Sequence, residues 1–295
     1  MDIAILSVSP QVYSTERLAL EAGKAGHFVE LIDPTKCSVK LGQGTPRIFL
    51  GSEDITDGFD AIIPRIGTTV TRHGAAIVKQ FELGGCFSTA MAQGILMARN
   101  KITTMQLMAQ RGIPIPQTVF SINPDNVGEQ IELLGGPPVI IKLQEGTQGK
   151  GVILAESKKS AKSMIDTLYN MNTGILLQRF IEEAMGEDLR VIVVGNRVVA
   201  GMKRVSGPDE FRSNVHRGAD TQAVKLTQRE KFIALGATRI LGLGVAGVDL
   251  IQSSAGPLLL EVNASPGLKG IERATGTNVA RHIIQFVEKH GRRTK

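Results

Sequence analysis

Short apolar runs and longer amphipathic stretches alternate along the first third of the chain. Residues 3–7, 28–32 and 60–63 are mostly apolar and have the length of buried strands. The stretches 15–24 and 69–83 carry apolar residues at helical spacing and are followed by glycines. Alternation of strands with helices predicts a parallel sheet that is covered by helices on both faces.

The middle of the chain predicts a second unit, made of helices and antiparallel strands. Asn100 precedes a helix expected over 101–110, where its side chain would cap the first turn. A further helix is expected to open at Asn123-Pro124, with proline in its first turn. The apolar runs 139–142 and 152–155 flank a glycine-rich segment, so we predict that they pair as antiparallel strands.

The last third is richer in hairpins. A Gly-Asn pair is a favourable two-residue turn between strands expected at 190–194 and 197–201. Two helices are expected further on, one over 228–241 that Thr227 would cap and a terminal one over 277–290.

A hairpin within residues 246–267 carries the most informative polar side chains. If Asp249 pairs with Glu261, a three-residue turn at 254–256 closes the hairpin, and its glycine supplies the backbone freedom. Residues two apart share a strand face, so Glu261 and Asn263 point the same way and Asp249 faces them. Three apolar residues are expected to point oppositely, into a core: Leu258, Leu260 and Val262.

Asp249, Glu261 and Asn263 form a candidate metal site. Oxygen ligands with few carboxylates suit Mg²⁺ that is also bound by the phosphates of a nucleotide. The competing interpretation is a pair of solvated acids at a strand edge. The apolar residues that flank Glu261 bury the strand and favour the metal site.

Residues 145–151 form a glycine-rich loop between the two predicted central strands. A strand follows the loop and its lysine precedes glycine, so it is no Walker A motif, and its spacing differs from the dinucleotide fingerprint. We predict a flap that closes over phosphates; an ordinary mobile hairpin tip is the alternative. The candidate phosphate contacts are Gly146, Thr147, Gln148, Gly149 and Gly151.

Two lysines and one apolar run are further candidates for nucleotide contacts. Lys142 ends the strand that enters the flap, and Lys101 lies at the start of a predicted helix, so either could bind a phosphate. The run that begins at residue 175 leads into a linker whose backbone could contact an adenine ring, or it is a plain core strand. The linker candidates are Gln178, Arg179, Phe180 and Ile181.

Several arginines are predicted near the same site. Asp188 and Arg190 alternate with apolar neighbours and therefore share one strand face, and Arg204 ends the partner strand. Arg65 directly follows a predicted strand, and a polar loop contains Arg212, Ser213 and Asn214. Guanidinium groups stabilise phosphoryl oxygens, although a surface salt-bridge network is the alternative for each arginine. The sequence shows no Ser-His-Asp order, so covalent catalysis by a side chain is not indicated. The remaining modes of catalysis are substrate positioning and charge neutralisation, as phosphoryl transfer requires.

Composition narrows the classes of function. With 295 residues, of which 42% are apolar, the chain can form one large or two packed domains. The net charge of +6 favours acidic partners, with a solvated surface and a frayed basic tail as the alternative. The content of 4% aromatic residues with no Trp argues against direct nucleic-acid binding. Cys37 and Cys86 form no metal or redox motif. Without a signal peptide or a membrane-spanning run, a cytoplasmic protein that contacts no membrane is expected.

Six stretches of the chain, in this order, resemble those of ATP-grasp carboxylate–amine ligases, and among them the RimK-type α-L-glutamate ligases. The resemblance extends over essentially the whole chain. It rests on PRIG (64–67), KLQEGTQGKG (142–151), DLR (188–190), FRSNVHRG (211–218), AGVD (246–249) and EVNASPG (261–267).

The resemblance implies an α/β and α+β protein with the ATP-grasp fold and an N-terminal pre-ATP-grasp α/β domain. It implies a pre-ATP-grasp domain at 1–95, a central lobe with the flap at 96–182 and a C-terminal lobe with the metal site at 183–295. It implies Mg²⁺ or Mn²⁺ on Asp249, Glu261 and Asn263. It implies that ATP binds to Lys101, Lys142, residues 178–181, Asp188 and residues 212–214.

The reaction implied by the resemblance converts an acceptor carboxylate into an acyl phosphate, which the α-amine of L-glutamate then attacks. Arg190 and Arg204 would hold the transferring group, Arg65 would hold the acidic substrate, and the closed flap would exclude water. The implied acceptor is an acidic peptide or protein C-terminus, such as that of a small-subunit ribosomal protein, or poly-α-glutamate. A homo-oligomer is expected.

The chain also departs from the family pattern. Arg179 stands where such proteins often carry Glu, and Lys203 and residues 205–210 are atypical, which leaves substrate contacts around Arg204 open. Two alternatives remain at this stage: a ligase for another acidic small molecule or amino acid, and a nucleotide-binding regulator or RNA-associated protein without ligase activity.

Overall fold

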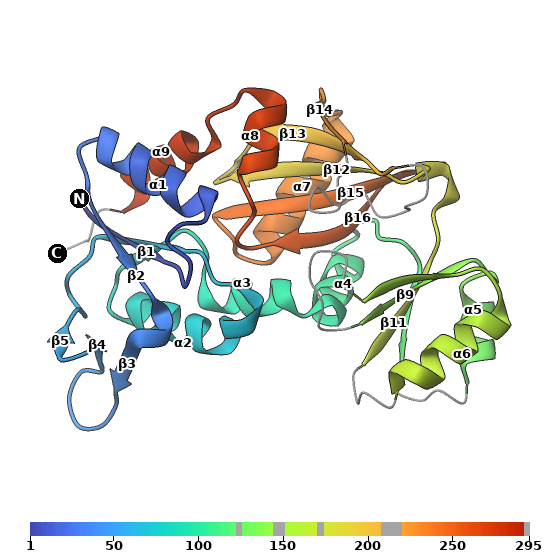
Figure 1. Cartoon of the computed structure of the whole chain (residues 1–295), viewed down its shortest axis with the longest axis horizontal. Coiled ribbons are helices and arrows are strands. Elements are labelled where there is room, and N and C mark those ends of the chain that lie inside the picture. Colours follow the sequence, from blue (N-terminus) through green and yellow to red (C-terminus); the bar gives the residue numbers. More distant parts are fainter. Residues whose placement is uncertain (122–125, 144–150, 170–173, 208–219, 292–295) are drawn as a thin grey trace.

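The computed structural model describes residues 1–121, 126–143, 151–169, 174–207 and 220–291. This part of the chain contains two four-stranded sheets, a five-stranded sheet and a small three-stranded sheet. Figure 1 shows the first sheet at one end of the molecule, the central four-stranded sheet at the other, and the five-stranded sheet between and above them.

The first sheet is parallel and has the strand order β2-β1-β6-β7. Its strands are β1 (Asp2–Leu6), β2 (Phe28–Ile32), β6 (Ala61–Pro64) and β7 (Phe87–Ser88). Helices α1 (Tyr13–Lys24) and α9 (Val279–His290) cover one face, against Ile3, Ile5 and Ile63. Helix α2 (Thr71–Leu83) covers the other face, against Leu6 and Ile62. The predicted parallel sheet with helices on both faces is confirmed.

Several short elements around this sheet were not predicted from the sequence. They are η1 (Pro34–Lys36), β3 (Cys37–Lys40), β4 (Arg47–Leu50), β5 (Glu53–Asp54), η2 (Thr68–Val70) and α3 (Ala92–Arg99). Strands β3 to β5 form the small antiparallel sheet. They are too short to show a clear alternation of apolar and polar residues.

The central unit begins with α4 (Lys101–Gln110), whose first turn is capped by Asn100 as predicted, with Thr103 N–H donating to its Oδ1 at 3.1 Å. The antiparallel sheet that follows has the order β10-β9-β11-β8. Its strands are β8 (Thr118–Ser121), β9 (Val139–Leu143), β10 (Val152–Ala155) and β11 (Ile175–Arg179). Helices α5 (Val127–Leu133) and α6 (Lys158–Tyr169) pack on one face, against Ile141 and Leu177. The predicted pairing of β9 with β10 is confirmed; Asn123-Pro124 lies outside the described residues.

The five-stranded sheet is antiparallel and has the order β14-β13-β12-β15-β16. Its strands are β12 (Glu187–Val194), β13 (Arg197–Val205), β14 (Asp220–Ala223), β15 (Val245–Ser253) and β16 (Gly256–Asn263). Helix α7 (Gln228–Ile240), capped by Thr227 as predicted, covers one face with Val191 and Val248. On the other face, α9 and α8 (Lys269–Thr275) cover only the apolar end, with Ile192 and Met202. The remainder of that face is polar.

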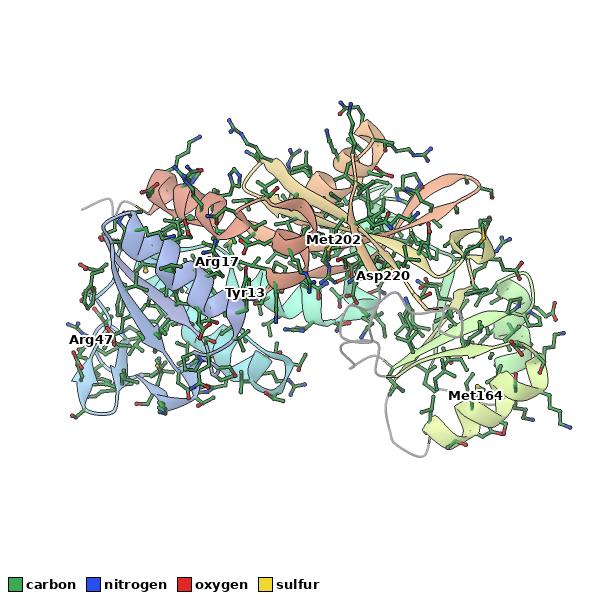
Figure 2. All side chains as sticks on the ribbon, turned by 45° about the horizontal axis from the view of Figure 1, so that its top comes forward. Tyr13, Arg17, Arg47, Met164, Met202 and Asp220 are labelled. Carbon is green, nitrogen blue, oxygen red and sulfur yellow. The ribbon has the colours of Figure 1, made fainter. Side chains whose placement is uncertain are left out.

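Helix α1 is fixed to the C-terminal helices by a buried carboxylate. The Tyr13 hydroxyl donates to Glu272 at 2.8 Å and Arg17 Nε donates to the same carboxylate at 3.2 Å. Figure 2 shows Tyr13 and Arg17 where the first helix meets these C-terminal helices. The first sheet and the five-stranded sheet therefore share one covering layer.

The β15–β16 hairpin corrects two predictions. Asp249 does pair with Glu261, but Ser253 pairs with Gly256, so the turn has two residues and the predicted three-residue turn is wrong. A bulge at Leu260 takes up the extra residue, since Leu250 pairs with Leu259. Leu259 is therefore the buried residue, its N–H donating to Pro114 O at 2.8 Å, while Leu258 and Leu260 are only half-buried instead of core residues. Val262 is buried as predicted.

The cysteines and helices give no sign of a disulfide or a membrane span. Cys37 and Cys86 are both buried and free, and burial raises the pKa of the Cys37 thiol to about 11. Among the helices of the described residues, none is long and apolar enough to cross a bilayer.

Candidate functional site

The polar end of the five-stranded sheet brings six predicted site residues onto one face. Cross-strand pairing places Arg204 opposite Asp188, Arg190 opposite Asp249, and Asp249 opposite Glu261. Partners in register, and residues two apart on one strand, share a face. The set comprises Asp188, Arg190, Arg204, Asp249, Glu261 and Asn263. The sequence predicted that Asp188 and Arg190 share one strand face and that Glu261 and Asn263 lie on the face of Asp249, and the register confirms both.

Asp249 lies at the centre of a buried network of ion pairs. Arg190 Nε and Nη2 donate to its two oxygens at 2.7 and 2.5 Å. Arg204 donates to Asp188 through Nε and Nη2, both at 2.5 Å, and its Nη2 also reaches Asp249 at 3.0 Å. Only 3% of Asp249 and 5% of Arg204 are exposed, so these two charges are held almost without water. Paired geometry of this kind fixes the direction of each guanidinium.

The network sets the ionisation of its buried members. Burial by itself would raise the pKa of Asp249, but the charges of Arg190 and Arg204 outweigh it and hold that pKa well below its usual range. Burial likewise opposes the charged form of Arg204, but Asp249 and Asp188 outweigh it and raise the pKa of the guanidinium. Asp249 is thus a carboxylate at neutral pH.

Glu261 is the accessible carboxylate of the group. Its side chain is 45% exposed, and Asn263 Nδ2 donates to its Oε1 at 3.0 Å. Arg190 lies 3.9 Å from the same oxygen. Glu261 therefore lies at the rim of the ion-pair network, where a ligand can reach it.

A divalent cation fits these donors if other ligands complete its shell. In the described part of the chain, no cluster of three or more His, Cys, Asp or Glu side chains could hold a metal ion. The local oxygen donors are two carboxylates and one amide, and those of Asp249 are shared with arginines. Nucleotide phosphates and water would have to supply the remaining oxygens, as is usual for Mg²⁺.

Lys142 brings the central sheet within electrostatic range of this network. Its side chain lies on the face of β9 that is opposite α5 and α6, and its Nζ donates to Gln178 Oε1 at 2.6 Å. Burial is the main cause that lowers the pKa of Lys142, to about 8; Glu261 attracts its charge and Lys101 repels it. Lys101 Nζ donates to Leu143 O at 3.4 Å, so both predicted lysines lie at this end of β9.

Two further arginines follow elements of the N-terminal part of the chain, Arg65 after β6 and Arg99 at the end of α3. Arg65 Nη2 donates to Pro266 O at 2.8 Å, and Arg99 Nη2 donates to Ile66 O at 2.9 Å. Burial lowers the pKa of Arg65 to about 10 and also lowers that of Arg99, which Glu261 partly offsets. Arg99 was not predicted; its only sequence signal is its position two residues before Lys101, at the end of an unpredicted helix.

The loop that carries Pro266 packs closely on the sheet. A side chain at Gly247 would meet Pro266 Cβ at 2.8 Å, so glycine is required for this approach. The same contact places the Pro266 carbonyl where Arg65 reaches it.

Some of the other predicted nucleotide contacts lie within the described residues, and some lie outside them. Arg179 is exposed at the end of β11, Phe180 is half-buried and Ile181 is 8% exposed. Gly151 has φ of +75°, and a Cβ there would meet the Leu143 side chain at 2.8 Å. Seven predicted residues lie outside the described residues: Gly146, Thr147, Gln148, Gly149, Arg212, Ser213 and Asn214.

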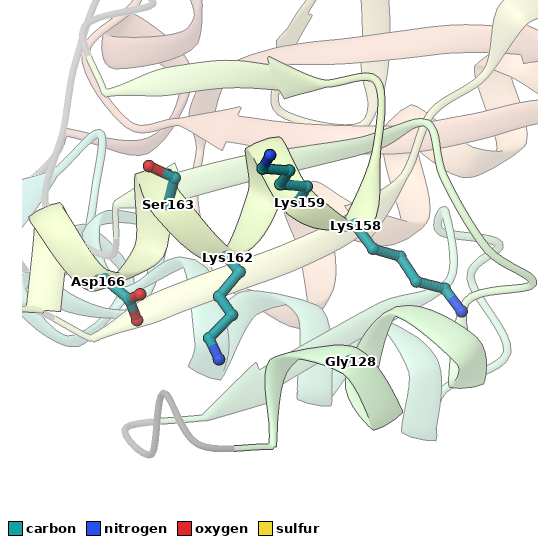
Figure 3. A pocket seen from close by; sticks show the side chains of 6 residues that line it. All are labelled: Gly128, Lys158, Lys159, Lys162, Ser163 and Asp166. Atoms are coloured by element: carbon teal, nitrogen blue, oxygen red, sulfur yellow. The ribbon is translucent and has the colours of Figure 1, made fainter.

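A separate depression of about 440 Å³ lies between α5 and α6 (Figure 3). Because these helices cover the opposite face of the central sheet, the depression is separated from Lys142 by that sheet. Its lining consists of Gly128, Lys158, Lys159, Lys162, Ser163 and Asp166. Its lining includes none of the predicted site residues that the structure describes.

Comparisons with known proteins show the family of the chain. Residues 1–95 match the RimK PreATP-grasp domain and residues 98–287 match the RimK-like ATP-grasp domain. The chain is 46% identical over 295 residues to "Probable alpha-L-glutamate ligase 2" of Shewanella sp. (strain MR-4), covering 100% of this chain and 98% of the relative. A protein of Alkalilimnicola ehrlichii named "Probable alpha-L-glutamate ligase" has the same identity and coverage.

Solved structures share the fold at low sequence identity. A RimK domain ATP-grasp protein from Sphaerobacter thermophilus superposes with a TM-score of 0.72 at 20% identity, covering 98% of this chain and 100% of that one. The ATP-grasp ligase PsnB, solved with a minimal precursor, Mg and ADP, gives 0.77 at 17% identity, covering 99% and 97%. These structures confirm the predicted ATP-grasp fold with its N-terminal domain. The chain belongs to the RimK-like ATP-grasp family and is an ATP-dependent ligase.

Proposed function

We propose that the protein is an ATP- and Mg²⁺-dependent carboxylate–amine ligase that adds L-glutamate to a carboxylate acceptor. One observation carries the proposal: the Asp188–Arg204–Asp249–Arg190 network lies beside the accessible Glu261 and within electrostatic range of Lys142. Carboxylates for a cation next to cationic groups for phosphates suit phosphoryl transfer from ATP. The naming of its relatives as alpha-L-glutamate ligases supports glutamate as the amine donor.

The proposed ATP site combines two parts of the chain. Lys101, Lys142 and residues 178–181 belong to the central lobe at 96–182, and the network belongs to the lobe at 183–295. Asp249, Glu261 and Asn263 would hold Mg²⁺, and Mn²⁺ suits the same oxygen donors. When bound, the cation offsets the negative charge of the ATP phosphates. The PsnB structure with Mg and ADP supports both ligands.

The proposed reaction has two steps. An oxygen of the acceptor carboxylate attacks the γ-phosphorus, and the bond to the ADP oxygen breaks, which gives an acyl phosphate and ADP. The α-amine of glutamate then attacks the acyl carbon and loses a proton; the C–O bond breaks and phosphate leaves. Arg190 and Arg204 are held rigidly by carboxylates, so their remaining N–H groups can stabilise the charge that develops on the phosphoryl oxygens without reorganising.

The acceptor is proposed to be an acidic peptide tail, either a protein C-terminus, such as that of a small-subunit ribosomal protein, or poly-α-glutamate. The guanidinium groups of Arg65 and Arg99, together with the net charge of +6, support an anionic substrate. Several structural neighbours, including PsnB, are described in complex with precursor peptides. Homo-oligomerisation stays a prediction, which light scattering of the purified chain would test.

One assay tests the proposal. The protein is incubated with ATP, Mg²⁺ and glutamate, with and without acidic peptides, and both ADP and product masses are measured. Glutamate-dependent ADP release with mass increases of whole glutamyl units is expected. ATP binding without any such product would contradict the proposal and favour a nucleotide-binding regulator.

A further inference from the structure

Gln178 lies beneath Lys142 on the central sheet and contacts it directly. Gln178 pairs with Ile140, two residues before Lys142, so both side chains lie on the same face. The Gln178 side chain accepts from Lys142 Nζ at 2.6 Å, and the residue is only 3% exposed. A side chain buried this deeply inside the sheet is poorly placed to reach a nucleotide itself.

The hydrogen bonds around Gln178 run in one direction. An ammonium group only donates, so the carbonyl end of the Gln178 amide must face Lys142. The amide nitrogen then donates to Thr118 Oγ1 at 2.9 Å, and the Thr118 hydroxyl donates to Pro116 O at 2.8 Å. Because the ammonium at one end only donates and the Pro116 carbonyl at the other end only accepts, the direction of every hydrogen bond between them is fixed. The amide orientation and, through it, the position of the ammonium are fixed as well.

Lys142 needs such an anchor because its electrostatic surroundings pull in several directions. Glu261 and Asp249 attract its charge from the five-stranded sheet, and Lys101 repels it from α4. A neutral acceptor holds the ammonium without cancelling its charge. Among the described residues, Gln178 accepts one N–H of Lys142, so the ammonium has further N–H groups that can bind a phosphate.

We propose that Gln178 is a positioning residue that holds Lys142 toward the phosphates of ATP and whose side chain does not touch the nucleotide. This assignment rests on the proposed ATP site and deepens it. The backbone of residues 178–181 stays available for the adenine. The competing possibility is that Gln178 only fills a buried polar position in the sheet.

A double-mutant cycle on ATP affinity separates these roles. Equilibrium binding of ATP with Mg²⁺ is measured by calorimetry for the wild type, Gln178→Leu, Lys142→Met and the double variant, with folding checked by thermal denaturation. We expect Gln178→Leu to weaken ATP binding by about tenfold, the scale for a hydrogen bond to a charged group. In the Lys142→Met background the same change should weaken binding by less than about twofold, because its target is gone.

Two further variants keep the test decisive if Gln178→Leu is unstable. Gln178→Glu retains an acceptor for Lys142 but cancels the ammonium charge and lacks the donor to Thr118, so it should weaken ATP binding by at least about tenfold. Thr118→Val removes the hydroxyl that accepts a hydrogen bond from Gln178. It should weaken ATP binding by about two- to threefold only when Lys142 is present. Equal losses with and without Lys142, or wild-type affinity of Gln178→Leu, would overturn the positioning role. If the wild type itself fails to bind ATP, the proposed function is wrong instead.

Discussion

The two polar regions that approach each other in this molecule are built in opposite ways. On the five-stranded sheet, two arginines and two aspartates neutralise one another through paired hydrogen bonds. On the central sheet, Lys142 rests on the neutral Gln178 instead. The first arrangement is rigid and its hydrogen bonds are nearly saturated, whereas in the described part of the chain Lys142 contacts no carboxylate directly. The difference indicates that the arginines of the five-stranded sheet are held in fixed directions, whereas Lys142 keeps its full charge for a ligand.

Breaking the saturated network should have the largest effect. Arg204→Met leaves Asp188 and Asp249 buried without their shared partner, which is expected to cost about 3–5 kcal/mol in the free energy of unfolding. Denaturant unfolding measures this loss. The matched control is its neighbour Lys203→Met, whose pair with Glu187 is a third exposed; its loss should be below about 1 kcal/mol. Equal losses for the two variants would show that the network is not buried in solution.

Removing the accessible member of the same face should affect turnover more than stability. Glu261→Ala is expected to reduce ligase turnover by at least ~10²-fold, the scale for one key electrostatic group. Its 45% exposure predicts little change in unfolding. Steady-state kinetics and Mn²⁺ binding, followed by electron paramagnetic resonance in the presence of nucleotide, test the assignment; turnover close to that of the parent would sink it.

ATP binding by Lys142, on the central sheet, should depend on pH. Since the pKa of Lys142 is about 8, ATP affinity is expected to fall as the ammonium deprotonates above that pH, by roughly tenfold. Lys142→Arg should flatten this dependence because arginine stays charged. Between pH about 8 and the ordinary lysine pKa of 10.5, the unfolded chain binds this proton more tightly, so the Lys142 contribution to stability rises with pH there. ATP affinity of the wild type and of Lys142→Arg is measured by titration across this pH range. The same pH dependence in both proteins would refute the role of Lys142 in binding ATP.

The smallest effect is expected from the substitution of Arg65. Arg65→Ala should raise the apparent Michaelis constant for the acidic acceptor by several-fold while ATP affinity stays near that of the parent, if the Arg65 guanidinium holds the acidic acceptor as proposed. Separate titrations of ATP and acceptor measure the two constants. A selective loss of ATP binding would contradict the assignment.

Sequence reasoning succeeded where the determining interactions are local. Asn100 and Thr227 cap their helices as predicted because capping involves residues only three positions away. Polar alternation placed Asp188 and Arg190 on one face because strand geometry has a period of two. The glycine-rich loop and residues 212–214 stay predictions, since they lie outside the described residues.

The predictions failed or were incomplete where a contact with a segment distant in the sequence determines the local structure. The bulge at Leu260 accompanies the bond from Leu259 to Pro114 O, a contact that the hairpin sequence does not reveal. Arg99 was missed because an arginine at a helix end resembles a solvated one; its link to Ile66 O requires the folded chain. The contact of Gln178 with Lys142 was not predicted, because the side-chain partners of Gln178, Lys142 and Thr118, belong to two other strands.

The covering of the first sheet by α9 has a consequence for how the protein folds during its synthesis. Ile3, Ile5 and Ile63 emerge early from the ribosome, but α9 is translated long after them. Until then, that apolar sheet face lacks part of its cover and is a site for chaperones or for aggregation. A nascent chain stalled before α9 is therefore expected to be the most vulnerable form of this ligase.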